Sequence, residues 1–183
     1  MKHLWAPWRL AFVENPNHGS GCIFCEKPAL KQDRRAYILW RSRHAYVMLN
    51  IYPYNNGHLL IAPYQHIATI EALPMPVLLD MMRLVQRAIN VLRLAYAPEG
   101  FNLGVNQGRV AGAGIEHHVH VHIVPRWAAD TSFMPLLGEI RVLPQHLKAS
   151  FARLKAAFTP NQRDSGRRTR RRPPRVSGGR RNR

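Results

Sequence analysis

The chain has 183 residues, of which 46% are hydrophobic, and this length and composition suit one ordinary globular domain with a buried core. The formal net charge is +17, but residues 163–183 hold ten Arg and a single acid, so more than half of the positive excess lies in a C-terminal tail. No run of about 18 apolar residues is present, and residues 1–20 do not resemble a signal peptide. These features argue against a membrane-spanning protein and make the cytoplasm the expected location.

The first features along the chain are an aromatic arm, Leu4-Trp5-Ala6-Pro7-Trp8-Arg9, and a cysteine pair, Cys22-Ile23-Phe24-Cys25. The arm suits a hydrophobic lid or an oligomer contact. Two reduced cysteines at this spacing are typical of half a zinc site or of a redox couple. A thioredoxin-like couple would follow a strand and open a helix in a βαβ unit, and no such pattern surrounds this pair. We therefore favour zinc, with two further ligands among the ten histidines.

The middle of the chain alternates short apolar runs with turn residues, which predicts strands joined by short connections. Strands are predicted at residues 36–40, 45–50, 58–62, 101–106 and 116–125. Apolar residues at helical spacing predict one long helix over 77–96 and a final helix over 144–158. The sequence therefore predicts an α+β domain over residues 1–158, with a mainly antiparallel five-stranded sheet, one long helix and a C-terminal helix.

Residues 159–183 consist mostly of Arg, Gly, Ser and Pro without apolar periodicity. Such a segment cannot offset its ordering entropy by burial, so a disordered Arg-rich tail is predicted. It could make weak, non-specific contacts with nucleic acid by neutralising phosphates.

The last predicted strand carries His118, His120 and His122 on one face, alternating with branched aliphatic residues on the other. Three imidazoles in a row favour either a metal site or a histidine nucleophile. A glycine-rich loop, residues 108–114, runs directly into this strand, and its backbone N–H groups could approach an anion closely. Together, loop and histidines favour a phosphate held against an imidazole that attacks phosphorus.

The segment His118-Val119-His120-Val121-His122-Ile123-Val124 resembles the signature of the histidine triad (HIT) superfamily of nucleotide hydrolases and transferases. The similarity covers about residues 1–158. The segments at residues 4–9, 125–127 and 130–135 resemble the bacterial diadenosine tetraphosphate phosphorylase (ATP adenylyltransferase) branch. The resemblance implies that His120 attacks the α-phosphorus to form a nucleotidyl-histidine, and that a backbone carbonyl keeps its other ring nitrogen protonated.

The resemblance also implies roles for the residues around the nucleophile. His122 would contact phosphate oxygens, Asn50 would lie near the ribose, and Trp127 would stack on adenine or pack in the core. The other implied substrate-binding residues are His58, Asn106, Gly112 and Gly114. Inorganic phosphate would be the co-substrate that releases ADP, with ATP as first product, whereas water as acceptor would make the enzyme a hydrolase that releases AMP.

Zinc-containing members of this superfamily imply a closed, structural Cys2His2 site at Cys22, Cys25, His66 and His118, with His117 as the alternative to His118. The resemblance further implies a homodimer or a higher homo-oligomer.

The sequence departs from many triad proteins just before the triad. Gly112-Ala113-Gly114-Ile115 lacks the small hydroxyl residue that could help to protonate a poor leaving group. This favours dinucleoside polyphosphates over phosphoramidates, because a polyphosphate leaves without such help. Two alternatives stay open: a metal-dependent phosphoesterase with the triad as ligands, and a basic nucleic-acid-binding protein without enzymatic activity.

Overall fold

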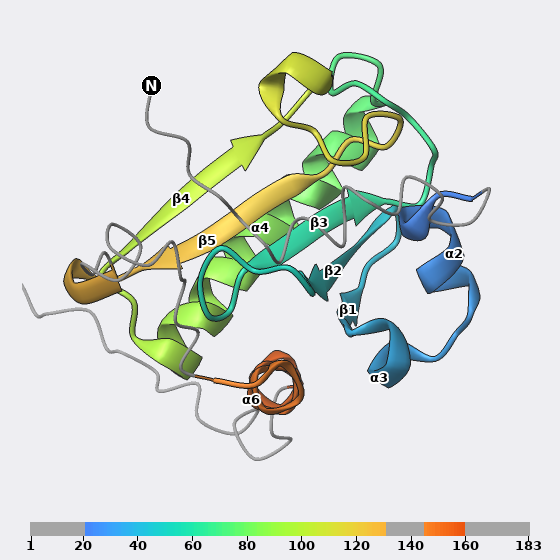
Figure 1. Ribbon diagram of the computed structural model, residues 1–183. Helices are drawn as coiled ribbons and strands as arrows, with labels where there is room; N and C mark the ends of the chain where they lie inside the picture. Colours follow the sequence, from blue (N-terminus) through green and yellow to red (C-terminus); the bar gives the residue numbers. More distant parts are fainter. Residues whose placement is uncertain (1–20, 131–144, 160–183) are drawn as a thin grey trace, which may run out of the picture.

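The computed structural model describes residues 21–130 and 145–159, which form one antiparallel sheet with helices on both sides (Figure 1). The strand order is β1-β2-β3-β5-β4. The strands are β1 (Ile38–Arg41), β2 (Ala45–Leu49), β3 (Leu59–Pro63), β4 (Gly100–Val105) and β5 (Val121–Arg126). The helices are α2 (Ile23–Ala29), α3 (Asp33–Ala36), α4 (Met75–Tyr96) and α6 (Leu147–Phe158), with 3₁₀ turns at Arg109–Ala111 and Ala128–Asp130. The predicted α+β class and five-stranded sheet are confirmed.

The central strands β2 and β3 are buried on both faces, so each strand contributes side chains to two hydrophobic clusters. Val47 and Ile61 face a large core that includes residues of α4 and α6. Their neighbours Met48 and Leu60 face a smaller cluster that includes Phe24 of α2. Because side chains alternate along a strand, one apolar run supplies both cores.

Helix α4 covers one face of the sheet, with α6 beside it at the β1 end (Figure 1). Its 22 residues include a proline near the N-terminus and end at Tyr96, and the next residue, Ala97, adopts a left-handed conformation with φ of 46°. The predicted long helix is confirmed, and it begins two residues before the predicted start. The opposite face is covered by α2 and by the loops before β5, and this face carries the histidines.

The structure differs from the sequence prediction at two places that bear on the site. Helix α2, which begins directly after Cys22, was not predicted, so the cysteine pair does open a short helix. Strand β5 begins only at Val121, because the backbone N–H of Val119 donates to the carbonyl of Ile67, 2.7 Å away, instead of to β3. The alternation of faces nevertheless continues back to His118, which is fully buried.

The aromatic arm at residues 4–9, the segment 131–135 and the Arg-rich tail beyond Thr159 lie outside the described residues. Among the helices that are described, none combines the length and the apolar character needed to cross a membrane.

Candidate active site and metal centre

His120 lies in a buried position against Phe24, whose ring centroid is 4.5 Å from that of the imidazole. Its Nδ1 lies 2.8 Å from the backbone carbonyl of His118. A carbonyl only accepts, so Nδ1 carries the proton and the lone pair is on Nε2. The predicted backbone acceptor for His120 is thus present, and it belongs to the triad itself.

A chain of hydrogen bonds also fixes the tautomer of His122. The backbone N–H of Tyr54 donates to Nδ1 of His58 over 3.1 Å, which leaves the proton of His58 on Nε2. Nε2 of His58 lies 3.0 Å from Nδ1 of His122 and donates to it. His122 therefore carries its own proton on Nε2 and is a hydrogen-bond donor from that atom.

Burial keeps the triad histidines neutral near pH 7. Desolvation lowers the pKa of His118 and that of His122 to about 4 each, and it lowers the pKa of His120 as well. A neutral imidazole whose lone pair is held in one place is the form that attacks an electrophile.

The predicted metal ligands Cys22, Cys25, His66 and His118 come together in one cluster, although they belong to three separate places in the chain. Their ligand atoms all lie within 4.8 Å of one another. Nδ1 of His118 is 3.3 Å from Sγ of Cys22 and 3.6 Å from Sγ of Cys25, and Sγ of Cys25 is 3.3 Å from Nδ1 of His66. A tetrahedral zinc with two sulfur and two nitrogen ligands separates its ligand atoms by about 3.3–3.8 Å, so the donor set fits zinc.

The partners of the cluster support the same interpretation. Nε2 of His118 donates to the carbonyl of Pro63 over 2.9 Å, which leaves Nδ1 unprotonated toward the cysteines, as a metal-bound histidine requires. Burial, and then the neighbouring Cys22, raise the pKa of the Cys25 thiol to about 11. A bound cation would reverse that shift, because thiolates are the form that binds zinc.

Other arrangements of histidine ligands are not formed. His117 is exposed and does not belong to the cluster. Within residues 21–130 and 145–159, no second group of three or more potential ligands exists, so the three triad rings do not form a metal site of their own. The geometry does not support the phosphoesterase alternative.

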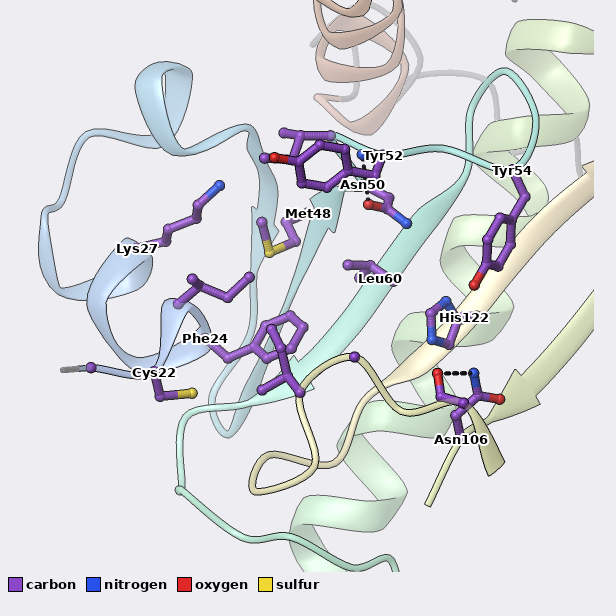
Figure 2. A pocket seen from close by; sticks show the side chains of 16 residues that line it. Cys22, Phe24, Lys27, Met48, Asn50, Tyr52, Tyr54, Leu60, Asn106 and His122 are labelled. Atoms are coloured by element: carbon purple, nitrogen blue, oxygen red, sulfur yellow. Dashed lines mark hydrogen bonds between the residues drawn. The ribbon is translucent and has the colours of Figure 1, made fainter. Parts of the chain in front are cut away.

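A cavity of about 220 Å³ opens next to the triad (Figure 2). It is lined by His122 and by five other residues that the sequence analysis singled out: Cys22, Asn50, Asn106, Gly112 and Gly114. Gly112 has φ of 80° and its carbonyl accepts from Nδ2 of Asn106 at 3.4 Å. Only glycine adopts this conformation readily, which explains its place at the turn.

Two predicted substrate-binding residues lie away from the cavity. His58 is fully buried and contacts His122, so it supports the triad rather than lining the cavity. Trp127 follows the end of β5, five residues beyond His122, and does not line the cavity, so a base stacked on Trp127 within this cavity is not supported.

Several lining residues were missed by the sequence analysis because no local pattern marks them. In the sequence, Phe24 is distinguished only by its place between two cysteines, yet it contacts His120 and lines the cavity. Tyr54, in the loop before β3, stacks on His58 with a centroid distance of 4.8 Å. Lys27 of α2 also lines the cavity.

A family model described as "HIT domain" matches residues 31–129. A relative from Mycobacterium tuberculosis named AP-4-A phosphorylase is 35% identical over 156 residues, which are 81% of this chain and 80% of the relative. A Saccharomyces cerevisiae protein named adenosine 5'-monophosphoramidase HNT1 is 30% identical over 131 residues, 66% of this chain and 78% of that protein.

A solved structure described as a Zn-bound histidine triad family protein from Mycobacterium smegmatis is 27% identical, with a TM-score of 0.60. The match covers 75% of this chain and 93% of that one. With the triad, the cavity beside it and these matches together, the chain belongs to the histidine triad, or HIT domain, family.

Proposed function

We propose that this protein is a nucleotidyl transferase that acts through a nucleotidyl-histidine on His120, and that its reaction is the phosphorolysis of diadenosine tetraphosphate to ATP and ADP. The observation that carries the proposal is the 2.8 Å hydrogen bond from Nδ1 of His120 to the carbonyl of His118, which leaves the Nε2 lone pair available for attack. The AP-4-A phosphorylase relative supports the choice of substrate.

In the first step, Nε2 of His120 forms a bond to the α-phosphorus while the bond from phosphorus to the bridging oxygen breaks. The electron pair leaves with that oxygen, and ATP departs. The Nε2 proton of His122 would donate to an oxygen of the phosphoryl group and so stabilise its charge. In the second step, an oxygen of inorganic phosphate attacks the adenylyl group, and His120 leaves with its electron pair restored. The product is ADP.

The lining of the cavity favours a polyphosphate leaving group. No Ser or Thr is among the described residues that line it, although Lys27, Tyr52 and Tyr54 carry donor groups there. An amine would need a proton donor in order to leave, whereas a polyphosphate oxygen needs little help. This supports the phosphorylase over the phosphoramidase activity for which the yeast relative is named.

We also propose a structural zinc ion at Cys22, Cys25, His66 and His118. When bound, zinc would supply a fixed tetrahedral anchor for three chain segments and no open position for substrate. A homo-oligomer is proposed on the resemblance alone, and the mass of the protein in solution tests it.

The decisive experiment follows labelled inorganic phosphate during turnover of diadenosine tetraphosphate. We expect ATP without label and ADP that carries the label in its terminal phosphate. His120→Ala should lower turnover by about three orders of magnitude or more, because it removes the attacking atom. His117→Ala, at an exposed neighbour, is the matched control and should keep turnover.

Production of AMP and ATP regardless of phosphate would instead support the hydrolase alternative, with the same intermediate. Full turnover by His120→Ala would contradict the mechanism. Loss of the main activity on truncation after Pro160, with His120→Ala unaffected, would favour the nucleic-acid-binding alternative.

A further inference from the structure

Lys27 is the one Lys or Arg among the described residues that line the cavity beside the triad. It lies three residues after Phe24 on α2, and residues at this spacing share a helix face. Figure 2 shows Lys27 on the α2 side of the cavity and His122 on the opposite side, with Met48 and Leu60 between them.

The ammonium of Lys27 has no partner within the described part of the chain. No hydrogen bond or ion pair is formed by it there, and burial alone lowers the pKa of its side chain. A half-buried charge beside apolar residues is unfavourable unless something compensates it. Because Lys27 lines the cavity, a ligand bound there could supply that compensation.

The position of Lys27 indicates which part of a ligand it meets. If a phosphoryl group lies at His122, then a nucleotide extends across the apolar middle of the cavity, over Phe24, Met48 and Leu60. The far end of that nucleotide is its base. In that arrangement Lys27, on the side of the cavity opposite His122, would meet the base edge and not the reacting phosphorus.

The chemistry of lysine indicates which base is favoured. An ammonium has three donors and no acceptor. Guanine presents two adjacent acceptors, O6 and N7, on one edge, whereas adenine presents N7 beside an amino donor. We propose that Lys27 recognises the base, and that it makes this cavity accept guanine nucleotides at least as well as adenine nucleotides. The proposal rests on the proposed function only in that the cavity binds a nucleotide.

Binding of GMP and AMP to the full chain, measured by calorimetry, tests this without turnover. We expect Lys27→Met, which keeps the length of the side chain and removes its charge, to weaken GMP binding about tenfold and AMP binding much less. IMP should behave as GMP does, because it shares O6 and N7. Lys27→Arg should recover most of the preference, and Lys148→Met, at an exposed lysine of α6, should change neither affinity.

Equal weakening of GMP and AMP binding by Lys27→Met would overturn the proposal, because it would mean contact with the shared ribose-phosphate. If Lys27→Met kept the wild-type affinities for both GMP and AMP, the proposal would be overturned as well, while the proposed function would stand. If the wild-type chain bound neither nucleotide, both the role of Lys27 and the proposed function would be overturned. Lys27→Gln gives the same readout if Lys27→Met does not fold.

Discussion

His122 shows how a single side chain acquires its chemical state from residues far away in the sequence. Its proton position depends on His58, 64 residues earlier, and through His58 on the backbone of Tyr54. Burial, and then the nearby His120, lower the pKa of His122 to about 4. The folded protein therefore holds this imidazole neutral where an exposed histidine would be partly charged.

This shift makes stability depend on pH. Between the ordinary imidazole pKa of about 6.5 and the lowered value in the fold, the unfolded chain binds a proton that the native state does not. Stability is thus full above about pH 6.5 and falls as the pH drops toward 4. We expect the urea midpoint to decrease between pH 7.5 and pH 5, and to decrease less in His122→Gln, which cannot take up that proton.

His117→Gln is the control for this experiment, because His117 is exposed and belongs neither to the triad nor to the ligand cluster. Its pH dependence should match that of the wild type. An identical decrease in His122→Gln and the wild type would contradict the assignment of the shift to His122.

At the scale of elements, α2 is the part of the site that depends most on its anchors. It has seven residues and contains Pro28, so it is too short to be stable on its own. The Cys22 and Cys25 side chains hold it through the ligand cluster, and the Phe24 ring packs against the sheet. Two hydrogen bonds add to this: the Tyr46 hydroxyl donates to the Phe24 carbonyl at 2.8 Å, and the Arg41 guanidinium donates to the Pro28 carbonyl at 3.0 Å.

Removal of the proposed zinc should therefore loosen α2 while leaving the sheet intact. We expect a strong chelator to increase amide hydrogen exchange over residues 22–30 and to leave β2 and β3 protected. Cys25→Ser should produce the same local pattern without chelator. Equal protection of residues 22–30 in metal-loaded and chelated protein would show that the helix does not need the ion.

The same elements mark what the sequence could and could not predict. The alternation from His118 to Ile123 predicted the two faces correctly, because a period of two depends on the local backbone alone. The start of β5 was misplaced, since Val119 bonds to Ile67 in a distant loop, and no local pattern encodes that partner. Helix α2 was missed because seven residues around a proline show no apolar periodicity.

At the scale of the whole molecule, the sheet separates a structural core from a functional face. Adjacent residues of β3 illustrate the division: Ile61 belongs to the core shared with α4, and Leu60 lines the cavity. Both are at least nine-tenths buried. Burial alone therefore does not distinguish their roles, but the direction of each side chain does.

Ile61→Ala and Leu60→Ala should differ in their effects on binding. Ile61→Ala should lower the free energy of unfolding by about 2–5 kcal/mol through the cavity it creates, with little change in nucleotide affinity. Leu60→Ala should weaken nucleotide binding in addition to any loss of stability. Denaturant unfolding and calorimetry on both variants measure this, and equal effects on affinity would contradict the division.

His118 contacts both the proposed metal site and the proposed nucleophile. Its ring nitrogen meets the cysteines, and its carbonyl holds the proton of His120. One residue thus joins the proposed ion to the proposed nucleophile, and thermodynamic linkage between two such sites is reciprocal. If the ion changes the affinity for the nucleotide by some factor, the nucleotide changes the affinity for the ion by the same factor. If the proposed ion strengthens nucleotide binding, bound nucleotide would hold that ion more tightly by the same factor.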